Sequence, residues 1–521
     1  MKKLLKWLDN NIIKLLLASY IFFIPLFPKL PFRMVDYTYI AIRLEDLFVA
    51  FVYLVFAIQL LRKKERINTQ YLILFILFWL SVFISFYLGY FVQKTIAVQN
   101  LGFLNSLRRI EYMAIFFVFA SSVRTRKDLV FFVRLILISI AIVTIYGLGQ
   151  KYFGWPAVQT MNPEYAKGYI LVLDSWARIS STFGGHYDLS AFLLFFMPFL
   201  LALTVKVNKW FYILFLLALS NLVLAASRVS YGAYVLSIFP FLLLFRKWKL
   251  FVLTAVITVG MTFLSNNLTQ RINRSLQTKQ IFIDKTTGQT TVPRRLQPDD
   301  LPIGDYIPNK TNVENRATDV YSDGISNINL NSKDVIAVKL NLLDDIRTEA
   351  HKAGKSLTKV EEDKMVDEAF RNMKVISTVI PDISVATRLQ VEWPRAINAF
   401  IKYPLFGKGP SSITEATDND YLRWLGEFGI VGTMFFLLIL GKLFLSLFFA
   451  ARNNTPDRFL IAGVLAGYFG LLINATFIDI FEASKVAFVF WMTMGMFVGY
   501  ITNIKSLPIV VSPLRTKKKK K

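Results

Sequence analysis

The chain has 521 residues and a mass of 59.9 kDa; 55% of its residues are hydrophobic, 18% are charged, and the mean hydropathy is +0.47. This composition excludes a disordered chain and argues against a single soluble domain, which would carry more charge and fewer long apolar stretches. The chain has no cysteine and only two histidines, His186 and His351. Disulfides, zinc thiolate sites, a cysteine nucleophile and a histidine-rich metal site are therefore excluded.

About 12 stretches are long and apolar enough to cross the hydrocarbon core of a bilayer, which is roughly 30 Å thick. In chain order they lie near 11–27, 44–61, 70–90, 108–123, 128–149, 188–205, 209–226, 229–245, 249–265, 430–450, 457–477 and 484–503. Because 11–27 lacks a small-residue cleavage site, we interpret it as a retained first helix rather than a signal peptide. The predicted fold class is an all-α polytopic membrane protein.

The net charge of +25 comes from cations that gather in short clusters between the predicted spans. If the N-terminus is cytoplasmic, the clusters at 62–66, 124–127, 206–209, 246–249, 452–458 and 517–521 all fall on the inner side. The positive-inside rule explains this placement completely, so we expect no nucleic-acid partner. Both termini are predicted to be cytoplasmic, which agrees with an even number of spans.

The same topology places the long polar stretch between the ninth and tenth spans outside the membrane. The predicted organisation is a membrane region 1–265, an extracytoplasmic loop domain 266–420, a second membrane region 421–505 and a basic cytoplasmic tail 506–521. Within the loop domain, 286–331 is predicted to be irregular, and 334–350 and 357–376 are predicted to be helices. A domain of this size indicates a function at the outer face of the membrane; the alternative is that it is a passive lid.

Charged residues also stand at the outer ends of the predicted spans, where the positive-inside rule does not place cations. Polar groups near membrane depth are costly, so these residues are candidates for a functional site. Arginine suits a diphosphate, because its guanidinium group binds phosphate oxygens bidentately and stays charged. The candidates are Arg43, Glu45, Asp46, Arg108, Arg109, Glu111, Arg178, His186, Asp188, Arg228, Arg388, Glu392, Arg395, Asp418, Asn419, Asp420, Asp479 and Glu482.

Each of these residues also has a purely structural interpretation. Arg108 or Arg109 could pair with Glu111, and Arg43 with Asp46, as salt bridges at helix ends. Arg388, Glu392 and Arg395 follow i, i+4, i+7 spacing, which predicts one helix face, and Glu392 could simply orient Arg388.

The most distinctive stretch precedes the tenth span. It runs Tyr-Pro-Leu-Phe-Gly-Lys-Gly-Pro from 403, Asp-Asn-Asp-Tyr-Leu-Arg from 418, and Glu-Phe-Gly-Ile-Val-Gly from 427. Gly407, Gly409 and Gly429 permit tight turns or a close approach of the backbone. We predict a short, half-buried helix at 419–428 with Asp418 at its N-terminus. The Gly-x-Gly here is not a nucleotide loop, since no Lys-Ser/Thr pair follows it.

These motifs resemble the signature of the O-antigen ligase / O-antigen polymerase superfamily of membrane glycosyltransferases. The matching motif covers 388–432 and includes Arg388, Trp393, Gly407, Gly409, Asp418, Asn419, Tyr421, Glu427 and Gly429. Weaker matches lie at 42–47, 178–184 and 226–228. About 12 helices with a large outer loop between the ninth and tenth is also the plan of that family. The resemblance covers most of the chain and is weakest at 270–385.

The resemblance implies a GT-C-like membrane fold that uses no metal and no cofactor. It implies transfer of a glycan from undecaprenyl diphosphate to an acceptor hydroxyl at the outer face of the cytoplasmic (inner) membrane, in cell-surface polysaccharide and lipopolysaccharide biosynthesis. The acceptor would be lipid A-core or a growing glycan. The donor diphosphate would be bound by arginines, for which the candidates are Arg109, Arg178, Arg228, Arg388 and Arg395.

The base that accepts the proton of the acceptor hydroxyl stays open between two residues. The histidine of the family motif is replaced here by Asp418, which becomes the candidate base. His186 is the second candidate, with a hydrogen-bonded interfacial residue as its structural alternative.

Three questions about function also stay open. The Asp-Asn version of the motif is as compatible with a repeat-unit polymerase as with a ligase. A transporter or flippase of lipid-linked sugars is the alternative from another class, although it would place charges near the bilayer midplane and often shows two related halves. Residues 286–376, which match the family poorly, are a hypothetical determinant of acceptor choice.

Overall fold

The computed structural model describes residues 2–34, 41–160, 165–174, 177–265, 268–269, 278–284, 290–291, 332–352, 357–379, 388–413, 417–453 and 457–505. The chain divides into two compact units, one formed by Met1–Ile272 with Val385–Lys521 and the other by Asn273–Ser384. The segment 388–413 therefore belongs to the helical first unit, whereas the sequence placed it at the end of a loop domain 266–420. The predicted basic tail 506–521 lies outside the described residues.

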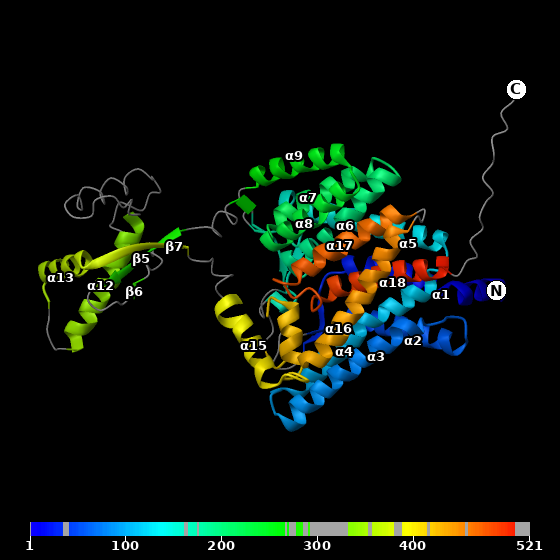
Figure 1. The fold of residues 1–521 in the computed structure, drawn as a ribbon, viewed down its shortest axis with the longest axis horizontal. Helices are drawn as coiled ribbons and strands as arrows, with labels where there is room; N and C mark the ends of the chain where they lie inside the picture. The colour runs from blue at the N-terminus through cyan, green and yellow to red at the C-terminus, as the bar shows by residue number, and fades with distance from the viewer. Residues whose placement is uncertain are drawn as a thin grey trace. The chain divides into compact units, whose positions relative to one another are not determined.

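The first unit is a bundle of helices (Figure 1). They are α1 (Lys2–Leu26), α2 (Leu44–Leu61), α3 (Thr69–Tyr87), α4 (Gln99–Ser122), α5 (Arg126–Tyr152), α6 (His186–Lys206), α7 (Phe211–Ala225), α8 (Arg228–Leu244), α9 (Trp248–Leu264), α15 (Trp393–Lys402), α16 (Asp420–Arg452), α17 (Arg458–Asn474) and α18 (Ser484–Lys505). Two short hairpins, β1 (Pro31–Met34) with β2 (Ala41–Arg43) and β3 (Ala157–Val158) with β4 (Ile170–Leu171), precede α2 and α6. Short helical turns are η1 (Leu88–Val92), η2 (Tyr165–Lys167) and η4 (Arg388–Glu392).

Among the described residues, seven helices are long and apolar enough to cross a membrane. They are α1, α2, α3 with its extension η1, α5, α6, α16 and α18, and the shorter apolar helices are α7, α8, α9 and α17. The predicted span 108–123 covers the second half of α4 and its C-cap Val123, and α4 is not among the seven. The length and composition of these helices confirm that this unit is helical and has the character of a membrane protein.

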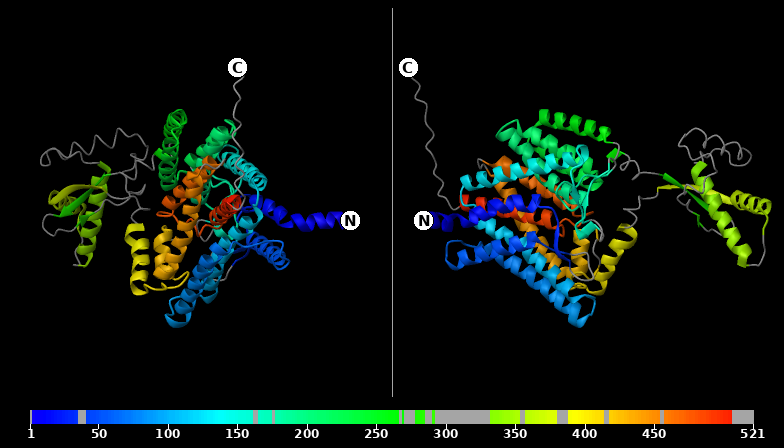
Figure 2. Two further views of the ribbon diagram at one scale, coloured as in Figure 1. Left: turned by 45° about the vertical axis from the view of Figure 1, so that its right-hand side comes forward. Right: turned by 180° about the vertical axis from the view of Figure 1, so that it is seen from behind.

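Two helices, α6 and α18, are buried along most of their length, because they are apolar on all sides. Glycines bring α18 close to α4: a Cβ on Gly495 would lie 2.3 Å from the carbonyl oxygen of Phe116, and one on Gly499 would lie 2.5 Å from that of Ala120. Such small-xxx-small spacing lets helix backbones meet in a membrane. Helices α3 and α16, far apart in the chain, also lie side by side (Figures 1 and 2).

The second unit combines two helices with a three-stranded antiparallel sheet. The strands are ordered β6 (Thr290–Thr291), β5 (Thr278–Asp284) and β7 (Met373–Val379), and the helices are α12 (Ser332–Lys352) and α13 (Lys359–Arg371). The predicted helix 334–350 is confirmed. The predicted helix 357–376 is correct from Lys359 to Arg371 and wrong beyond it. Met373–Val379 is instead a strand, because it is rich in β-branched residues and pairs with β5 along its whole length. Apart from β6, the stretch 286–331 lies outside the described residues.

Candidate functional site

A short helical segment begins the tenth predicted span. Helix α16 begins at Asp420, and the side chain of Asn419 caps it by accepting a hydrogen bond from the Leu422 N–H at 3.0 Å. Gly429 interrupts the helix with φ 63° and ψ −167°, a backbone conformation that is essentially restricted to glycine. The predicted short helix 419–428 is thereby confirmed, although the cap is Asn419 and Asp418 precedes it.

The glycine-rich loop before this helix satisfies the backbone groups that the break leaves free. The hydrogen bonds run from Ile430 N–H to Pro404 O (2.8 Å), Val431 N–H to Leu405 O (3.1 Å), Lys408 N–H to Gly426 O (2.8 Å) and Gly409 N–H to Glu427 O (3.0 Å). Gly407 and Gly429 both have positive φ, and a Cβ on either would lie 2.4 Å from backbone atoms of the facing segment. The two glycine motifs of the sequence are therefore two halves of one interlocked structure.

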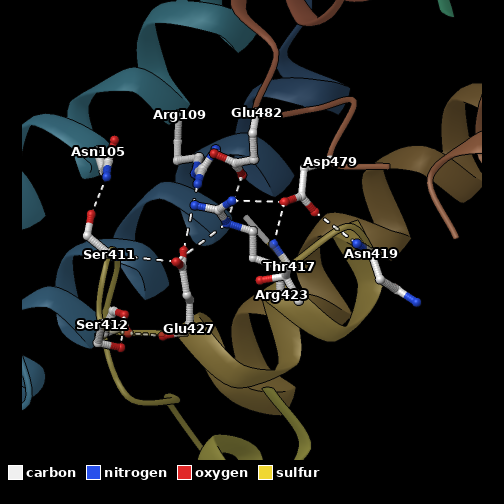
Figure 3. Close-up of polar contacts among 12 residues, drawn as sticks. Asn105, Arg109, Ser411, Ser412, Thr417, Asn419, Arg423, Glu427, Asp479 and Glu482 are labelled. Atoms are coloured by element: carbon white, nitrogen blue, oxygen red, sulfur yellow. Dashed lines mark hydrogen bonds and ion pairs between the residues drawn. The ribbon is translucent and has the colours of Figure 1, made fainter. Parts of the chain in front are cut away.

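Behind this loop lies a cluster of two arginines and three carboxylates, the acid–arginine cluster: Arg109, Arg423, Glu427, Asp479 and Glu482 (Figure 3). Its members come from α4, α16 and the loop between α17 and α18. The contacts are Arg109 to Glu482 at 2.5 Å, Arg109 to Glu427 at 3.8 Å, Arg423 to Asp479 at 3.1 Å, Arg423 to Glu427 at 3.5 Å and Arg423 to Glu482 at 3.9 Å. The cluster holds three distant parts of the chain together.

Because the cluster is buried, each of its charged side chains depends on its partners for compensation of its charge. Both arginine side chains are 6% exposed, and the Glu427 side chain is fully buried. Burial acts to raise the pKa of Glu482, but the neighbouring Arg109 and Arg423 outweigh it and lower that pKa, which keeps the carboxyl ionised. Removing one partner would leave a buried charge without compensation.

Asp479 fixes the turn that carries Asp418. Its carboxylate accepts hydrogen bonds from the backbone N–H groups of Thr417 (2.8 Å), Asp418 (3.2 Å) and Asn419 (3.0 Å). In return, the carboxylate of Asp420 accepts from the N–H of Ile480 at 2.8 Å, so the two loops hold each other. Asp418 has φ 49°, a left-handed conformation uncommon for residues with a side chain. These hydrogen bonds therefore fix the geometry of the turn, and the left-handed backbone conformation of Asp418 costs conformational energy.

Asp418 forms an ion pair with Arg388 at 2.6 Å, in which the arginine is 7% exposed and the aspartate 31% exposed. Burial raises the pKa of Asp418, with Arg388 opposing the rise and Asp479 adding to it. Burial also raises the pKa of Glu392 to about 7, with a contribution from Asp418. A partly exposed carboxyl with a raised pKa can accept a proton, and the buried guanidinium group beside it can bind an anion. The two groups together can do both at the same place.

Several buried polar atoms near this pair have no hydrogen-bond partner among the described residues. They are Arg388 Nε, Glu392 Oε2, Trp393 Nε1 and Thr417 Oγ1. Buried polar groups are satisfied in most native structures, and a group that is not satisfied calls for an explanation such as a ligand or water. The surroundings of Asp418 and Arg388 thus have the donor and acceptor capacity of a binding site.

The predicted helix face that carries Arg388, Glu392 and Arg395 does not lie on one continuous α-helix. Arg388–Glu392 forms a π-helical turn, η4, before α15 begins at Trp393. The i, i+4, i+7 spacing assumes a single α-helix, whereas here it crosses the junction between the π turn η4 and α15. Arg388 is buried and Arg395 is exposed, and the charges of both arginines act to lower the pKa of Glu392.

The other predicted donor-binding residues lie at helix starts. Arg109 pairs with Glu427 and Glu482 rather than with Glu111. Arg228 is half-buried and begins α8 directly after its cap Ser227.

Arg178 and His186 meet at the same tyrosine. The Arg178 guanidinium carbon lies 5.8 Å from the ring centroid of Tyr187, and its Nη1 is buried without a hydrogen-bond partner among the described residues. His186 begins α6, is 2% exposed, and its ring centroid lies 4.1 Å from that of Tyr187.

A second group of buried charged residues was not predicted from the sequence, apart from Asp188. The Nζ of Lys485, at the start of α18, donates to the carbonyl oxygens of Phe27 and Thr182, both at 2.6 Å, and of Pro25 at 3.2 Å. Beside it, Lys29 pairs with Asp188 at 3.4 Å. A lysine at the outer start of an apolar span was the available signal. Because all three Lys485 protons have carbonyl partners, we interpret this lysine as a structural residue that holds the start of α18 against the segments that carry these carbonyls.

Arg423 was also missed as a site residue, although it stands in the quoted motif. Its signal was the i, i+4 spacing to Glu427 on the predicted short helix. Arg108, in contrast, does not join the cluster: it lines a cavity of about 350 Å³ between α2 and α4, together with Asp46 and Glu111.

In the described part of the chain, no three His, Asp or Glu side chains lie together in a way that could hold a metal ion. No protein-family model matches the chain, and no curated protein sequence matches it either.

Proposed function

We propose that the protein is an O-antigen ligase-like glycosyltransferase. It moves a glycan from undecaprenyl diphosphate to an acceptor hydroxyl at the outer face of the cytoplasmic membrane. A GT-C-like fold with about 12 spans and both termini in the cytoplasm belongs to the same proposal. The observation that carries it is the Asp418–Arg388 pair, in which a partly exposed carboxylate lies 2.6 Å from a buried arginine on a turn held by Asp479.

The proposed reaction is a displacement at the anomeric carbon of the donor sugar. The acceptor hydroxyl oxygen forms the new glycosidic bond while its proton passes to the carboxylate of Asp418. The bond between the anomeric carbon and the diphosphate oxygen breaks, and the electron pair leaves with the diphosphate. Arg388 neutralises the charge that develops on that leaving group. The raised pKa of Asp418 makes it a stronger base than an ordinary aspartate.

Asp418 is a better candidate for the base than His186. Its side chain is 31% exposed, whereas His186 is 2% exposed and lies against Tyr187. Asp479 has a positioning role, since three consecutive backbone N–H groups of the turn bind to it. The buried Nη1 of Arg178, which has no hydrogen-bond partner among the described residues, is a further donor for phosphate oxygens.

The same chemistry serves a ligase, whose acceptor is lipid A-core, and a repeat-unit polymerase, whose acceptor is a growing glycan. A transporter of lipid-linked sugars is the second candidate, favoured by the break in α16 at Gly429, since broken helices are common at transporter binding sites. Against it, the backbone groups freed by this break are satisfied by the loop 404–409 rather than left to a substrate.

The test is transfer of an undecaprenyl-diphosphate oligosaccharide by the full chain in reconstituted vesicles. Asp418→Asn and Arg388→Gln are each expected to lower the transfer rate by about 100-fold or more. The control Lys402→Gln removes an exposed cation at the end of α15 and should change the rate less than about twofold.

The products separate the candidates. A ladder of repeats identifies a polymerase and a single transferred glycan identifies a ligase. Full activity of Asp418→Asn would rule out the proposed base. Movement of the donor across the bilayer without transfer would replace the enzyme by a transporter.

A further inference from the structure

A basic cavity lies at the far end of α4 from the acid–arginine cluster. It has a volume of about 640 Å³ and lies among the loop between α2 and α3, the end of α4 and the end of α18. Its cations are Lys63, Lys64, Arg66 and Arg124. Arg109 and Arg124 are 15 residues apart, about 22 Å along a helix, so this cavity is separate from the proposed catalytic site.

The cavity keeps an excess of positive charge. Arg124 pairs with Glu65 at 2.7 Å, and Lys64 pairs with Asp9. Neither Lys63 nor Arg66 forms an ion pair within the described residues, and both are exposed. Asp9 also pairs with Arg62, so the four cations that line the cavity face at most two carboxylates and keep at least two uncompensated positive charges.

Part of this basic wall is held in a fixed position. Arg124 donates from Nε to the carbonyl oxygen of Ser121 at 3.0 Å and from Nη2 to that of Lys64 at 3.2 Å. These bonds tie the loop after α2 to the end of α4. The positive-inside rule accounts for cations on such loops, but it does not require them to surround a cavity.

The surroundings favour a lipid as the source of the anion. Leu61, the last residue of α2, is 84% exposed beside the basic loop, and Ile58 one turn earlier is 45% exposed. An exposed apolar helix surface next to a basic cavity suits an acyl chain and a charged headgroup together. Basic pockets between membrane helices bind the headgroups of anionic lipids, and a volume of this size is typical of ligand pockets.

We propose that this cavity binds the phosphate of an anionic phospholipid headgroup at the membrane surface. Lys63 and Arg66 supply the uncompensated charge, and Arg124 supplies the ordered wall. The proposal does not rest on the glycosyltransferase function.

The experiment measures binding of a short-chain phosphatidylglycerol to the purified full chain in detergent, with phosphatidylcholine as the neutral comparison. The double variant Lys63→Gln/Arg66→Gln is expected to weaken phosphatidylglycerol binding by about tenfold or more. The matched control Lys206→Gln/Lys209→Gln removes two exposed cations at and just after the end of α6 and should weaken it less than about twofold. Phosphatidylcholine binding should not respond to either variant.

A second variant tests the space inside the cavity without changing the charge around it. Thr502→Trp introduces a large side chain at an exposed lining position of α18 and leaves the charge unchanged, and it should also weaken phosphatidylglycerol binding. Equal losses in the cavity and control variants would overturn the proposal, as would unchanged binding in both cavity variants. Inorganic phosphate that binds as tightly as phosphatidylglycerol would overturn the assignment to a lipid.

Discussion

At one end of the helical unit, Arg109 and Arg423 are almost completely buried and pair with carboxylates from distant segments. At the other end, cations such as Arg62 and Lys63 lie on a short loop and are exposed. Asp457 is a partial exception there, since it is buried while its partner Arg126 is 64% exposed. The comparison teaches that the same residue types serve two purposes. The exposed cations form the pattern from which the topology is predicted, whereas the buried ones hold the tertiary structure of the candidate site together.

The largest expected effect tests this difference directly. Arg423→Ala would leave Glu427, Asp479 and Glu482 with one guanidinium group fewer in a buried setting. We expect a loss of about 3–5 kcal/mol in the free energy of unfolding, because uncompensated buried charges are costly. Thermal unfolding of the purified protein measures it. Arg62→Ala, at the exposed end, should shift the melting temperature far less, and equal shifts would contradict the comparison.

The break in α16 gives the second prediction. Gly429→Ala places a Cβ 2.4 Å from the Leu405 carbonyl oxygen and forces a conformation that only glycine adopts easily. We expect a destabilisation of about 1–3 kcal/mol in the same unfolding assay. Gly441→Ala is the control on the same helix, since nothing lies within 4 Å of a Cβ there. Equal stability of the two variants would show that the interlocked loops contribute little.

The smallest effect concerns pH. Burial raises the pKa of Glu392 from 4.5 to about 7, so the folded protein keeps a proton that the unfolded chain releases between these values. The folded state therefore loses stability as the pH rises from about 4.5 to about 7. Glu392→Gln should remove that loss and be more stable than the wild type by about 1 kcal/mol at pH 8, after allowance for solvent screening of a half-exposed group.

Melting temperatures between pH 5 and pH 8 measure this effect. The wild type and Glu392→Gln should differ little at pH 5 and diverge towards pH 8. Glu368→Gln, at an exposed position of α13, is the control and should follow the wild type throughout. A constant difference between the wild type and Glu392→Gln at every pH would contradict the assigned titration.

The helices and the break in α16 could be predicted because their signals are local. A run of apolar residues long enough for a bilayer is a property of one segment. Each predicted span overlaps a helix, and seven of the described helices are long and apolar enough to cross a membrane. The short helix before Gly429 could be predicted from the spacing of glycines around it. The boundary between α13 and β7 could not, because β7 forms against β5, a strand far away in the chain.

For the candidate site, the sequence determined which residue types gather at the ends of the spans, and it singled out Arg388, Asp418 and the glycine motifs. The tertiary structure decided the pairings: Arg109 with Glu427 and Glu482, Arg423 with Asp479, and Lys485 with three carbonyl oxygens. The physical reason is that a helix propensity or an apolar run is encoded within a few turns of chain. A buried charge, in contrast, takes whichever opposite charge or dipole the folded backbone brings within a few ångströms.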